Sequence, residues 1–149
     1  MRILMVCLGN ICRSPLAEGI LKQKIKQSQL NWEVDSAGTS GWHSGELPDK
    51  RSIQIATKHG IDITEQKSRK VRSIDYEYFD IIFAMDTQNH KDLLSLAKEE
   101  EASKIRLILN EIYPGEDQSV PDPYWDDNGF EKVYRMLDEA CNVIIEKYK

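Results

Sequence analysis

The chain has 149 residues, of which 40% are hydrophobic and 30% charged, and it carries a formal net charge of −5. This length and composition are typical of one globular domain, so we expect residues 1–149 to form a single domain. The acidic charge disfavours nucleic acid as a partner. No apolar run approaches the roughly twenty residues of a membrane span, so we expect no membrane partner either.

The chain begins with a strand, a turn and a helix. Residues 2–7 (RILMVC) form a short, mostly apolar run, which is typical of a strand buried on both faces. After the turn "LGN", the stretch "SPLAEGILKQKIK" has apolar residues at helical spacing. Ser14 is a suitable N-cap for this helix, and Pro15 suits its first position.

A second strand and a second helix follow. Residues 32–38 (WEVDSAG) predict the strand, and a long loop rich in Gly and Ser occupies residues 39–48. Asp49 is a good N-cap for a helix that runs to His59 and ends at Gly60.

The second half of the chain repeats the alternation of strand and helix. Residues 79–86 predict a third buried strand, residues 87–97 a helix, and residues 104–109 a fourth strand. The inward residues of the helix over 87–97 are expected to be Leu93, Leu94 and Ala97. The last helix has apolar residues at spacings of three and four, namely Phe130, Val133, Tyr134, Leu137, Cys141, Ile144, Ile145 and Tyr148.

This alternation predicts an α/β fold, in which a parallel sheet has helices on both faces. Ligands of such sheets bind at the carboxyl ends of the strands. Cys7, Asp35, Ser36 and Asp86 are all expected at that edge, and the long loops over 39–48 and 113–129 leave from it. Loops of this length in a compact domain are often functional.

The stretch "VCLGNICRSP" predicts an anion site between the first strand and the first helix. The amides of residues 8–13 can converge on one point, and the helix adds the positive end of its dipole. Gly9 and Asn10 tolerate the positive φ angles of such a turn. Arg13 offers two donors that match two phosphate oxygens. The residues expected to bind phosphate are Leu8, Gly9, Asn10, Ile11, Cys12, Arg13 and Ser14.

Cys7 stands at the floor of this loop, where the same donors stabilise the negative charge of its thiolate. A thiolate beneath a bound tetrahedral anion is placed for in-line attack on phosphorus. The loop therefore predicts a phosphoryl-transfer site with Cys7 as the nucleophile. A buried cysteine that ends a strand would be the purely structural interpretation.

Together with "DSAGTSGW", "FDIIFAMD" and "DPYW", the stretch "VCLGNICRSP" resembles the low-molecular-weight protein tyrosine phosphatases, and the resemblance covers the whole chain. It implies a three-layer αβα sandwich with a four-stranded parallel sheet in the order 2-1-3-4. It also implies hydrolysis of phosphotyrosine through a cysteinyl-phosphate intermediate, with no metal and no other cofactor.

Asp122 lies between two prolines in "VPDPYW". An isolated Asp-Pro pair more often marks an ordinary turn. The resemblance instead implies that Asp122 is the general acid, which protonates the leaving oxygen and then activates water. It further implies that Trp42 and Tyr124, rather than Trp125 and His43, flank the ring of the substrate.

Three residues are expected to support the phosphate-binding loop. The resemblance implies that Ser14 hydrogen-bonds the sulfur of Cys7 and that Ser36 contacts Asn10, whose side-chain amide would lock the loop. Where the family often has a histidine, this chain has Gln66, which can still donate a hydrogen bond.

The chain has three cysteines, an odd and small number that favours a reducing, cytoplasmic compartment. Cys12 is either a small buried residue or a redox partner that forms a disulfide with oxidised Cys7. Cys141 lies on the apolar stripe of the last helix, where packing is expected.

Three alternatives remain at this point. An arsenate reductase of the same fold needs further redox cysteines, which are absent here. A protein-arginine phosphatase of this fold carries threonine where this chain has Ile11. A non-enzymatic phospho-binding module would lack the nucleophile or the acid. The expected partner is therefore a phosphotyrosine-containing protein or a small aryl phosphate, with phosphate and other oxyanions as inhibitors.

Overall fold

The computed structural model describes all of residues 1–149 and contains one four-stranded parallel sheet in the order β2-β1-β3-β4. This is the predicted fold class and strand order. The strands are β1 (Arg2–Cys7), β2 (Glu33–Gly38), β3 (Ile81–Ala84) and β4 (Ile105–Leu107). The helices of six residues or more are α1 (Arg13–Gln27), α2 (Lys50–Lys58), α3 (Ser73–Tyr78), α4 (Thr87–Leu96), η1 (Glu99–Lys104) and α5 (Gly129–Tyr148).

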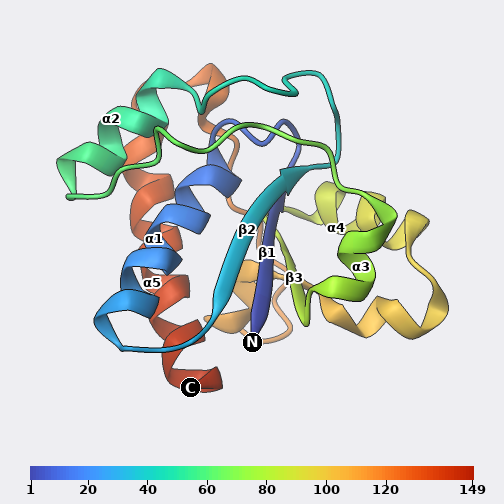
Figure 1. Ribbon diagram of the computed structural model, residues 1–149. Helices are drawn as coiled ribbons and strands as arrows, with labels where there is room; N and C mark the ends of the chain where they lie inside the picture. The colour runs from blue at the N-terminus through green and yellow to red at the C-terminus, as the bar shows by residue number, and fades with distance from the viewer.

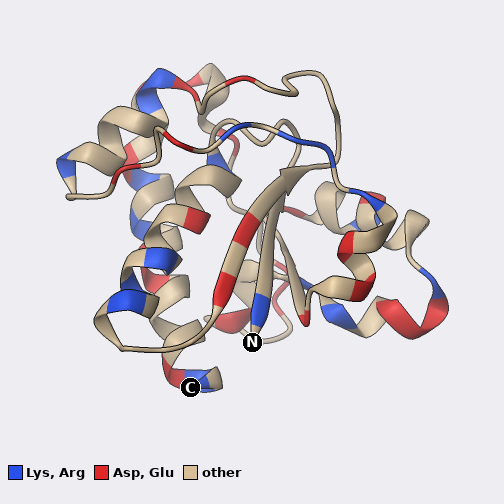
Figure 2. Cartoon of the chain, viewed as in Figure 1, with Lys and Arg blue, Asp and Glu red and all other residues tan.

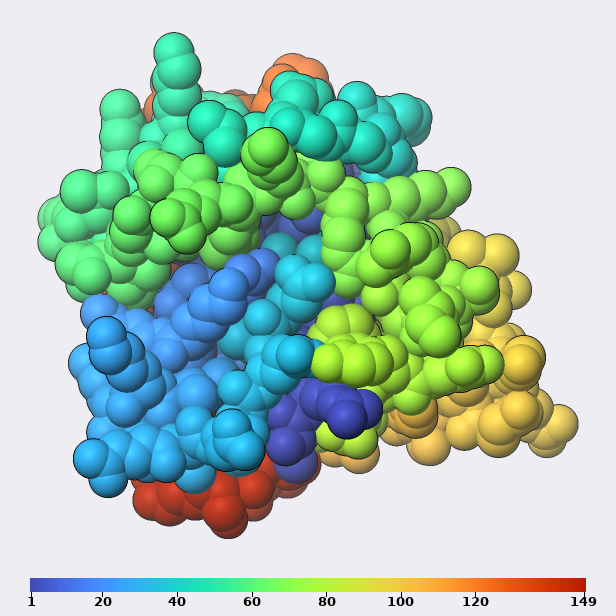
Figure 3. Space-filling model, in the orientation of Figure 1, coloured from blue at the N-terminus to red at the C-terminus, as the bar shows by residue number.

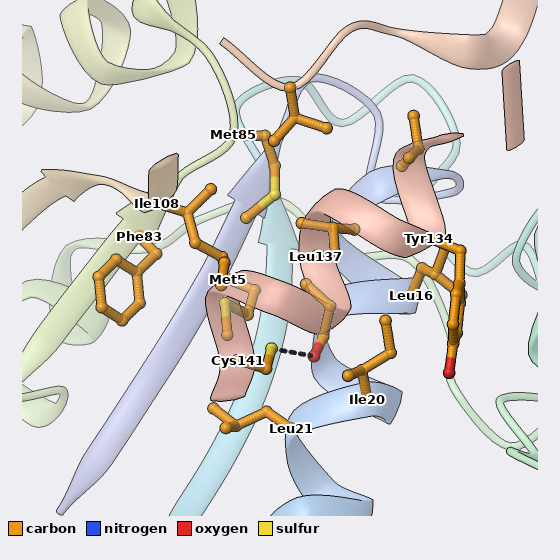
Figure 4. Close-up of a cluster of buried hydrophobic side chains, with 14 of the residues drawn as sticks. Met5, Leu16, Ile20, Leu21, Phe83, Met85, Ile108, Tyr134, Leu137 and Cys141 are labelled. Carbon is orange, nitrogen blue, oxygen red and sulfur yellow. Dashed lines mark hydrogen bonds between the residues drawn. The ribbon is translucent and has the colours of Figure 1, made fainter. Parts of the chain in front are cut away.

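The helices cover both faces of the sheet, so the molecule has three layers (Figure 1). The core between the sheet and the layer of α1, α2 and α5 is a cluster of 28 buried residues, whereas the cluster beneath α3 and α4 has ten. Figure 4 shows part of the larger core, where Leu16 and Ile20 of α1 meet Leu137 and Cys141 of α5. The expected packing role of Cys141 is confirmed by its complete burial.

The central strands are apolar because both of their faces are covered. Between them, β1 and β3 carry a charge only at Arg2, and both appear almost uncoloured in the charge view (Figure 2). The edge strand β2 instead carries Glu33 and Asp35, visible as two red bands. Charged residues on an edge strand disfavour pairing with a second sheet.

Several predicted elements differ from the observed ones. Ser14 does not cap α1, because the helix begins at Arg13, two residues before the predicted first position, and Cys12 occupies the N-cap position without a side-chain hydrogen bond. The Ser14 hydroxyl points instead toward the sulfur of Cys7. Pro15 accordingly stands in the third helical position. In α4, Leu93 is buried as expected, whereas Leu94 is exposed.

The strand β1 has the predicted bounds, whereas β2, β3 and β4 are shorter than their predicted runs, and α3 was not predicted from the sequence. The run over 104–109 splits into β4 and the 3-10 helix η2 (Ile108–Glu111), which turns the chain away from the sheet. Asp49 caps α2 as predicted, since its side chain accepts a hydrogen bond from the amide of Arg51 at 2.8 Å. No helix is both long enough and apolar enough to cross a bilayer.

The carboxyl ends of β1, β2 and β3 meet at one edge, from which the loops after β1 and β2 leave (Figure 1). The stretch between α2 and α3 crosses above this edge, and Figure 3 shows its green atoms lying across the blue atoms of α1 and the cyan atoms of β2. Ser68 in this stretch donates a hydrogen bond of 3.0 Å to the carbonyl of Gly9. The loop after β1 is thereby held between the sheet and a covering segment.

Candidate active site

The loop of residues 8–13, here called the phosphate loop, has backbone amides that are free to bind a ligand. No protein group accepts a hydrogen bond from the amides of residues 9–12. Asn10 provides the turn with a φ of 55°, in the left-handed region that Asn tolerates better than most residues. Cys7 ends β1 beneath the loop and is 2% exposed. Converging unpaired amides at a helix N-terminus are suited to bind an anion.

A close backbone approach fixes the position of this loop on the sheet. Gly38 pairs with Cys7 in the register of β1 and β2. A Cβ atom at Gly38 would lie 2.8 Å from the carbonyl oxygen of Leu8 and 3.2 Å from the amide nitrogen of Asn10. Only glycine fits here, which explains why β2 ends in small residues.

A buried chain of hydrogen bonds leads from the sulfur of Cys7 into the protein. The Cys7 sulfur lies 3.0 Å from the Ser14 hydroxyl, and the Asn10 side-chain amide donates to the Ser14 oxygen at 2.8 Å. The same amide donates to the Ser36 hydroxyl at 3.0 Å. Ser36 in turn donates to the Glu18 carboxylate at 2.7 Å. The structure thus brings Cys7, Asn10, Ser14 and Ser36 together at the positions that the sequence suggested.

Glu18 is a member of this chain that sequence reasoning missed. Its carboxyl is 3% exposed and also accepts a hydrogen bond from Lys22 at 2.6 Å. Burial raises the pKa of Glu18, against the opposing effect of the hydrogen bonds from Lys22 and Ser36. An acidic residue on the buried side of a helix, one turn after the phosphate loop, was the available signal.

Arg13 connects the phosphate loop to Asp86, between β3 and α4, and to the segment that carries Asp122. One of its terminal nitrogens donates to the Asp86 carboxylate at 2.7 Å and to the carbonyl of Val120 at 3.0 Å. The other lies 3.9 Å from the Asp122 carboxylate. Its Nε is buried without a protein partner. Burial alone lowers the pKa of Arg13, but the negative charges of Cys7 and Asp86 raise it overall.

Asp86, which the sequence predicts at this edge of the sheet, is a further residue of the site. It caps α4 by accepting a hydrogen bond from the Asn89 amide at 2.7 Å. Its other carboxylate oxygen holds the Arg13 guanidinium. Asp86 therefore orients the arginine that the sequence singled out. The contact joins residues 73 positions apart, so no local pattern announced it.

Asp122 lies in an exposed loop over residues 121–128, here called the acid loop. The Asp122 side chain is 39% exposed and accepts a hydrogen bond of 3.0 Å from the Tyr124 amide. This contact opens the short 3-10 helix η3 (Pro123–Trp125). The structure brings Asp122 and Cys7 into the lining of the same cavity, although they are far apart in the sequence.

This cavity has a volume of about 270 Å³ and is walled by aromatic side chains. Its lining consists of Cys7, Leu8, Gly9, Ile11, Cys12, Arg13, Trp42, His43, Asp122, Tyr124 and Trp125. Trp42 and Trp125 are 78% and 87% exposed, which places their rings at the mouth rather than in the core. All four aromatic residues weighed from the sequence, including Trp125 and His43, therefore line the cavity.

Cys12 and Gln66 complete the set of residues singled out from the sequence. Cys12 is buried, and its burial together with the charge of Asp49 raises its pKa. All three cysteines are free thiols, so the redox role of Cys12 stays a prediction. Gln66 donates a hydrogen bond of 3.1 Å to the carbonyl of Pro15, and its own oxygen is buried without a partner. Gln66 thus supports the first turn of α1.

Comparisons with known proteins agree with this site. Residues 2–149 match the family model described as low molecular weight phosphotyrosine protein phosphatase. The human low molecular weight phosphotyrosine protein phosphatase is 36% identical over 149 residues, a match that covers 97% of this chain and 94% of the human protein.

Solved structures show the same fold. A protein tyrosine phosphatase from Entamoeba histolytica, with Hepes in its active site, is 39% identical, with a TM-score of 0.93 over 99% of this chain and 96% of that one. A Drosophila arginine phosphatase is 37% identical, with a TM-score of 0.93 over 100% of this chain and 98% of that one. The chain therefore belongs to the low molecular weight phosphotyrosine protein phosphatase family, whose members are hydrolases of phosphoric monoesters.

Proposed function

We propose that residues 1–149 form one catalytic domain, which hydrolyses either phosphotyrosine in proteins or small aryl phosphates. Cys7 is the nucleophile, Arg13 binds the phosphoryl group, and Asp122 is the general acid and base. The observation that carries this proposal is the set of unpartnered donors above Cys7, namely the amides of residues 9–12 and the Nε of Arg13. The Nε of Arg13 is buried, and buried donors without a partner are rare unless they bind a ligand.

In the first step, the Cys7 thiolate attacks phosphorus while the bond from phosphorus to the aryl oxygen breaks. The loop amides and Arg13 hold the three equatorial oxygens, whose charge they stabilise in the transition state. Asp122 donates its proton to the departing oxygen, because a phenolate is a poor leaving group. The products of this step are the phenol and a cysteinyl phosphate.

In the second step, water attacks the cysteinyl phosphate. The Asp122 carboxylate, left ionised by the first step, accepts a proton from this water. The bond between phosphorus and sulfur breaks, and inorganic phosphate leaves. The hydrogen bond between Ser14 and the Cys7 sulfur stabilises the departing thiolate. Phosphate and similar oxyanions therefore compete with the substrate for the same donors.

The aromatic walls favour a flat substrate group. Trp42 and Tyr124 line the cavity, and stacking on their rings would place an aryl phosphate over Cys7. A phosphoserine side chain is too short to bring its backbone past these rings. The similarity to a Drosophila arginine phosphatase supports phosphoarginine as the second candidate substrate. Ile11 lines the cavity and offers no polar group to a guanidinium, which favours tyrosine.

The test is an assay of the purified protein on phosphotyrosine, phosphoserine and phosphoarginine peptides. We expect release from phosphotyrosine alone, its loss in Cys7→Ser, and its strong reduction in Asp122→Asn. Cys141→Ala serves as the matched thiol control and should keep the activity. Preference of the wild type for phosphoarginine would overturn the substrate assignment, and full activity of Cys7→Ser would overturn the mechanism. Ile11→Thr tests whether this position sets the choice.

The cytoplasm is the compartment that we propose for this enzyme. The nucleophile has to stay a free thiol, and all three cysteines are free in the structure. A reducing environment maintains that state.

A further inference from the structure

Arg51, which the sequence did not single out, is the centre of a cluster of contacts beside the active site. Its guanidinium forms a two-point contact with Asp49, with nitrogen–oxygen distances of 3.0 and 2.9 Å. Its remaining terminal nitrogen donates to the Asp127 carboxylate at 2.6 Å. One cation thus bridges the start of α2 and the far end of the acid loop.

The same guanidinium also lies against two aromatic rings. Its central carbon is 5.5 Å from the ring centre of Tyr124 and 4.7 Å from that of Phe130. Contacts of this kind are attractive, because the face of an aromatic ring carries partial negative charge. Tyr124 in turn packs edge-on against Trp125, with ring centres 4.8 Å apart. Arg51 therefore supports the cavity wall as well as the end of the loop.

The start of α2, from which Arg51 projects, is itself attached to the phosphate loop. The amide of Asp49 donates to the carbonyl of Ile11 at 2.8 Å. The hydroxyl of Ser52 donates to the carbonyl of Cys12 at 3.1 Å. The backbone from which Arg51 projects is consequently fixed relative to the nucleophile. Its guanidinium is fixed to the loop that carries Asp122.

Arg51 does not belong to the lining of the substrate cavity. It faces the carboxylates of Asp49, the N-cap of α2, and of Asp127 in the acid loop, whereas Lys58 at the end of the same helix pairs with Glu131 at 3.4 Å. The hydrogen bonds that Arg51 donates to the carboxylates of Asp49 and Asp127 raise its pKa, so Arg51 stays a cation.

We propose that Arg51 is a positioning residue that sets the distance between the acid loop and the phosphate loop. Arg13 holds Val120, the residue just before the acid loop, and Arg51 holds the loop itself through Asp127 and Tyr124. With both ends fixed, the Asp122 carboxyl stands over the leaving oxygen. This inference rests on the proposed role of Asp122 as the general acid. A displacement of one ångström at a reacting group can cost about 100-fold in rate.

The test compares two esters with different leaving groups, phenyl phosphate and 4-nitrophenyl phosphate. A general acid matters most for the poorer leaving group, phenol. We expect Arg51→Met to lower kcat/KM for phenyl phosphate by about tenfold and for 4-nitrophenyl phosphate by no more than about threefold. Arg51→Lys keeps the charge but not the planar guanidinium, so its kcat/KM for phenyl phosphate should lie between those of the wild type and Arg51→Met. Asp127→Asn should also lower kcat/KM more for phenyl phosphate than for 4-nitrophenyl phosphate. Lys58→Met, which breaks an ion pair of the same helix, should match the wild type.

Amide hydrogen exchange over residues 121–128 supplies a readout that does not depend on the role of Asp122. Exchange there should be faster in Arg51→Met than in the wild type or in Lys58→Met. Equal losses of kcat/KM for the two esters, or unchanged exchange, would overturn the positioning role. Absence of any leaving-group effect in Asp122→Asn would overturn the acid assignment alone, and faster exchange in Arg51→Met would still support the anchor.

Discussion

The phosphate loop and the acid loop meet over the same cavity, but the protein holds them in opposite ways. In the phosphate loop, the side chains of Asn10 and Arg13 are buried and hydrogen-bonded to groups from other elements. In the acid loop, Asp122, Tyr124 and Trp125 are exposed. The comparison teaches that the anion site is built into the core, whereas Asp122, the proposed proton donor, lies in an exposed loop that Arg13 contacts from the core and Arg51 from the start of α2.

This difference follows from what each loop has to do. Donors that stabilise a transition state act best when they are already in place, since no reorganisation is then required. If Asp122 is the acid, as we propose, its loop has to admit a substrate ring and release a phenol, which a buried loop would prevent. Substitutions in the phosphate loop should therefore change both the stability of the protein and its reaction rate. Substitutions in the acid loop should change the rate or the binding of substrate alone.

The largest effect is expected where the two loops are joined. Arg13→Lys keeps the charge but loses the guanidinium that contacts Asp86 and Val120 and that we propose to bind the phosphoryl group. We expect kcat/KM for aryl phosphates to fall by about 1,000-fold and inhibition by inorganic phosphate to weaken. Steady-state kinetics with phosphate as a competing ligand measures both. A loss below tenfold would show that the loop amides suffice without the arginine.

The next largest effect tests whether the phosphate loop is part of the core. Asn10→Ala removes bonds to Ser14, Ser36 and the amide of Arg69, and leaves a left-handed φ without the side chain that favours it. We expect the free energy of unfolding to fall by about 2–4 kcal/mol, and kcat to fall as well. Denaturant unfolding is the measurement. Gln29, also at φ 55° but in an exposed turn, is the control, and Gln29→Ala should change little.

A smaller effect is expected in the acid loop. Trp125 is 87% exposed, so Trp125→Ala should leave the melting temperature within about 2 °C of the wild type. Loss of a stacking surface should raise KM for phosphotyrosine peptides by about three- to tenfold, with little change in kcat. Calorimetry and peptide kinetics test both statements. A marked loss of stability would mean that the acid loop, too, belongs to the core.

The smallest effect concerns the buried end of the hydrogen-bond chain. Because burial raises the pKa of Glu18, the folded state holds this proton more tightly than the unfolded state does. Stability should therefore decline as pH rises from the unfolded value, about 4.3, through the raised folded value. Glu18→Gln cannot lose a proton and should show a flatter decline. Urea unfolding at a series of pH values decides this, and parallel curves for the two proteins would contradict it.

The fold was predictable because its signals are local. Apolar runs bounded by turn residues indicated each strand, and the alternation with helices indicated a parallel sheet with two covered faces. The strand order and the family came from the resemblance of "VCLGNICRSP" and the later motifs, which the comparisons confirm. Asp49 was predicted as the cap of α2 and Cys141 as a core residue because both roles depend on position along one helix.

The cap of α1 shows where local reasoning fails. Ser14 has a good N-cap side chain, but in the folded protein its hydroxyl contacts Cys7 and Asn10, and α1 begins at Arg13. The tertiary contacts outweigh a local preference of roughly 1 kcal/mol. Leu94 was placed inward for a similar reason, and it is exposed because α4 packs on the sheet through Leu93.

By itself, the sequence determined the α/β fold and the phosphate loop with Cys7 and Arg13, because residue types and short spacings carry that information. Asp122, Trp42 and Tyr124 became candidates through the resemblance to the family. Only the tertiary structure decided which distant groups hold these residues in place. Asp86 orients Arg13 across 73 positions, and Arg51 reaches Asp127 across 76. Such contacts depend on how strands and helices pack, and no local pattern in the chain encodes them.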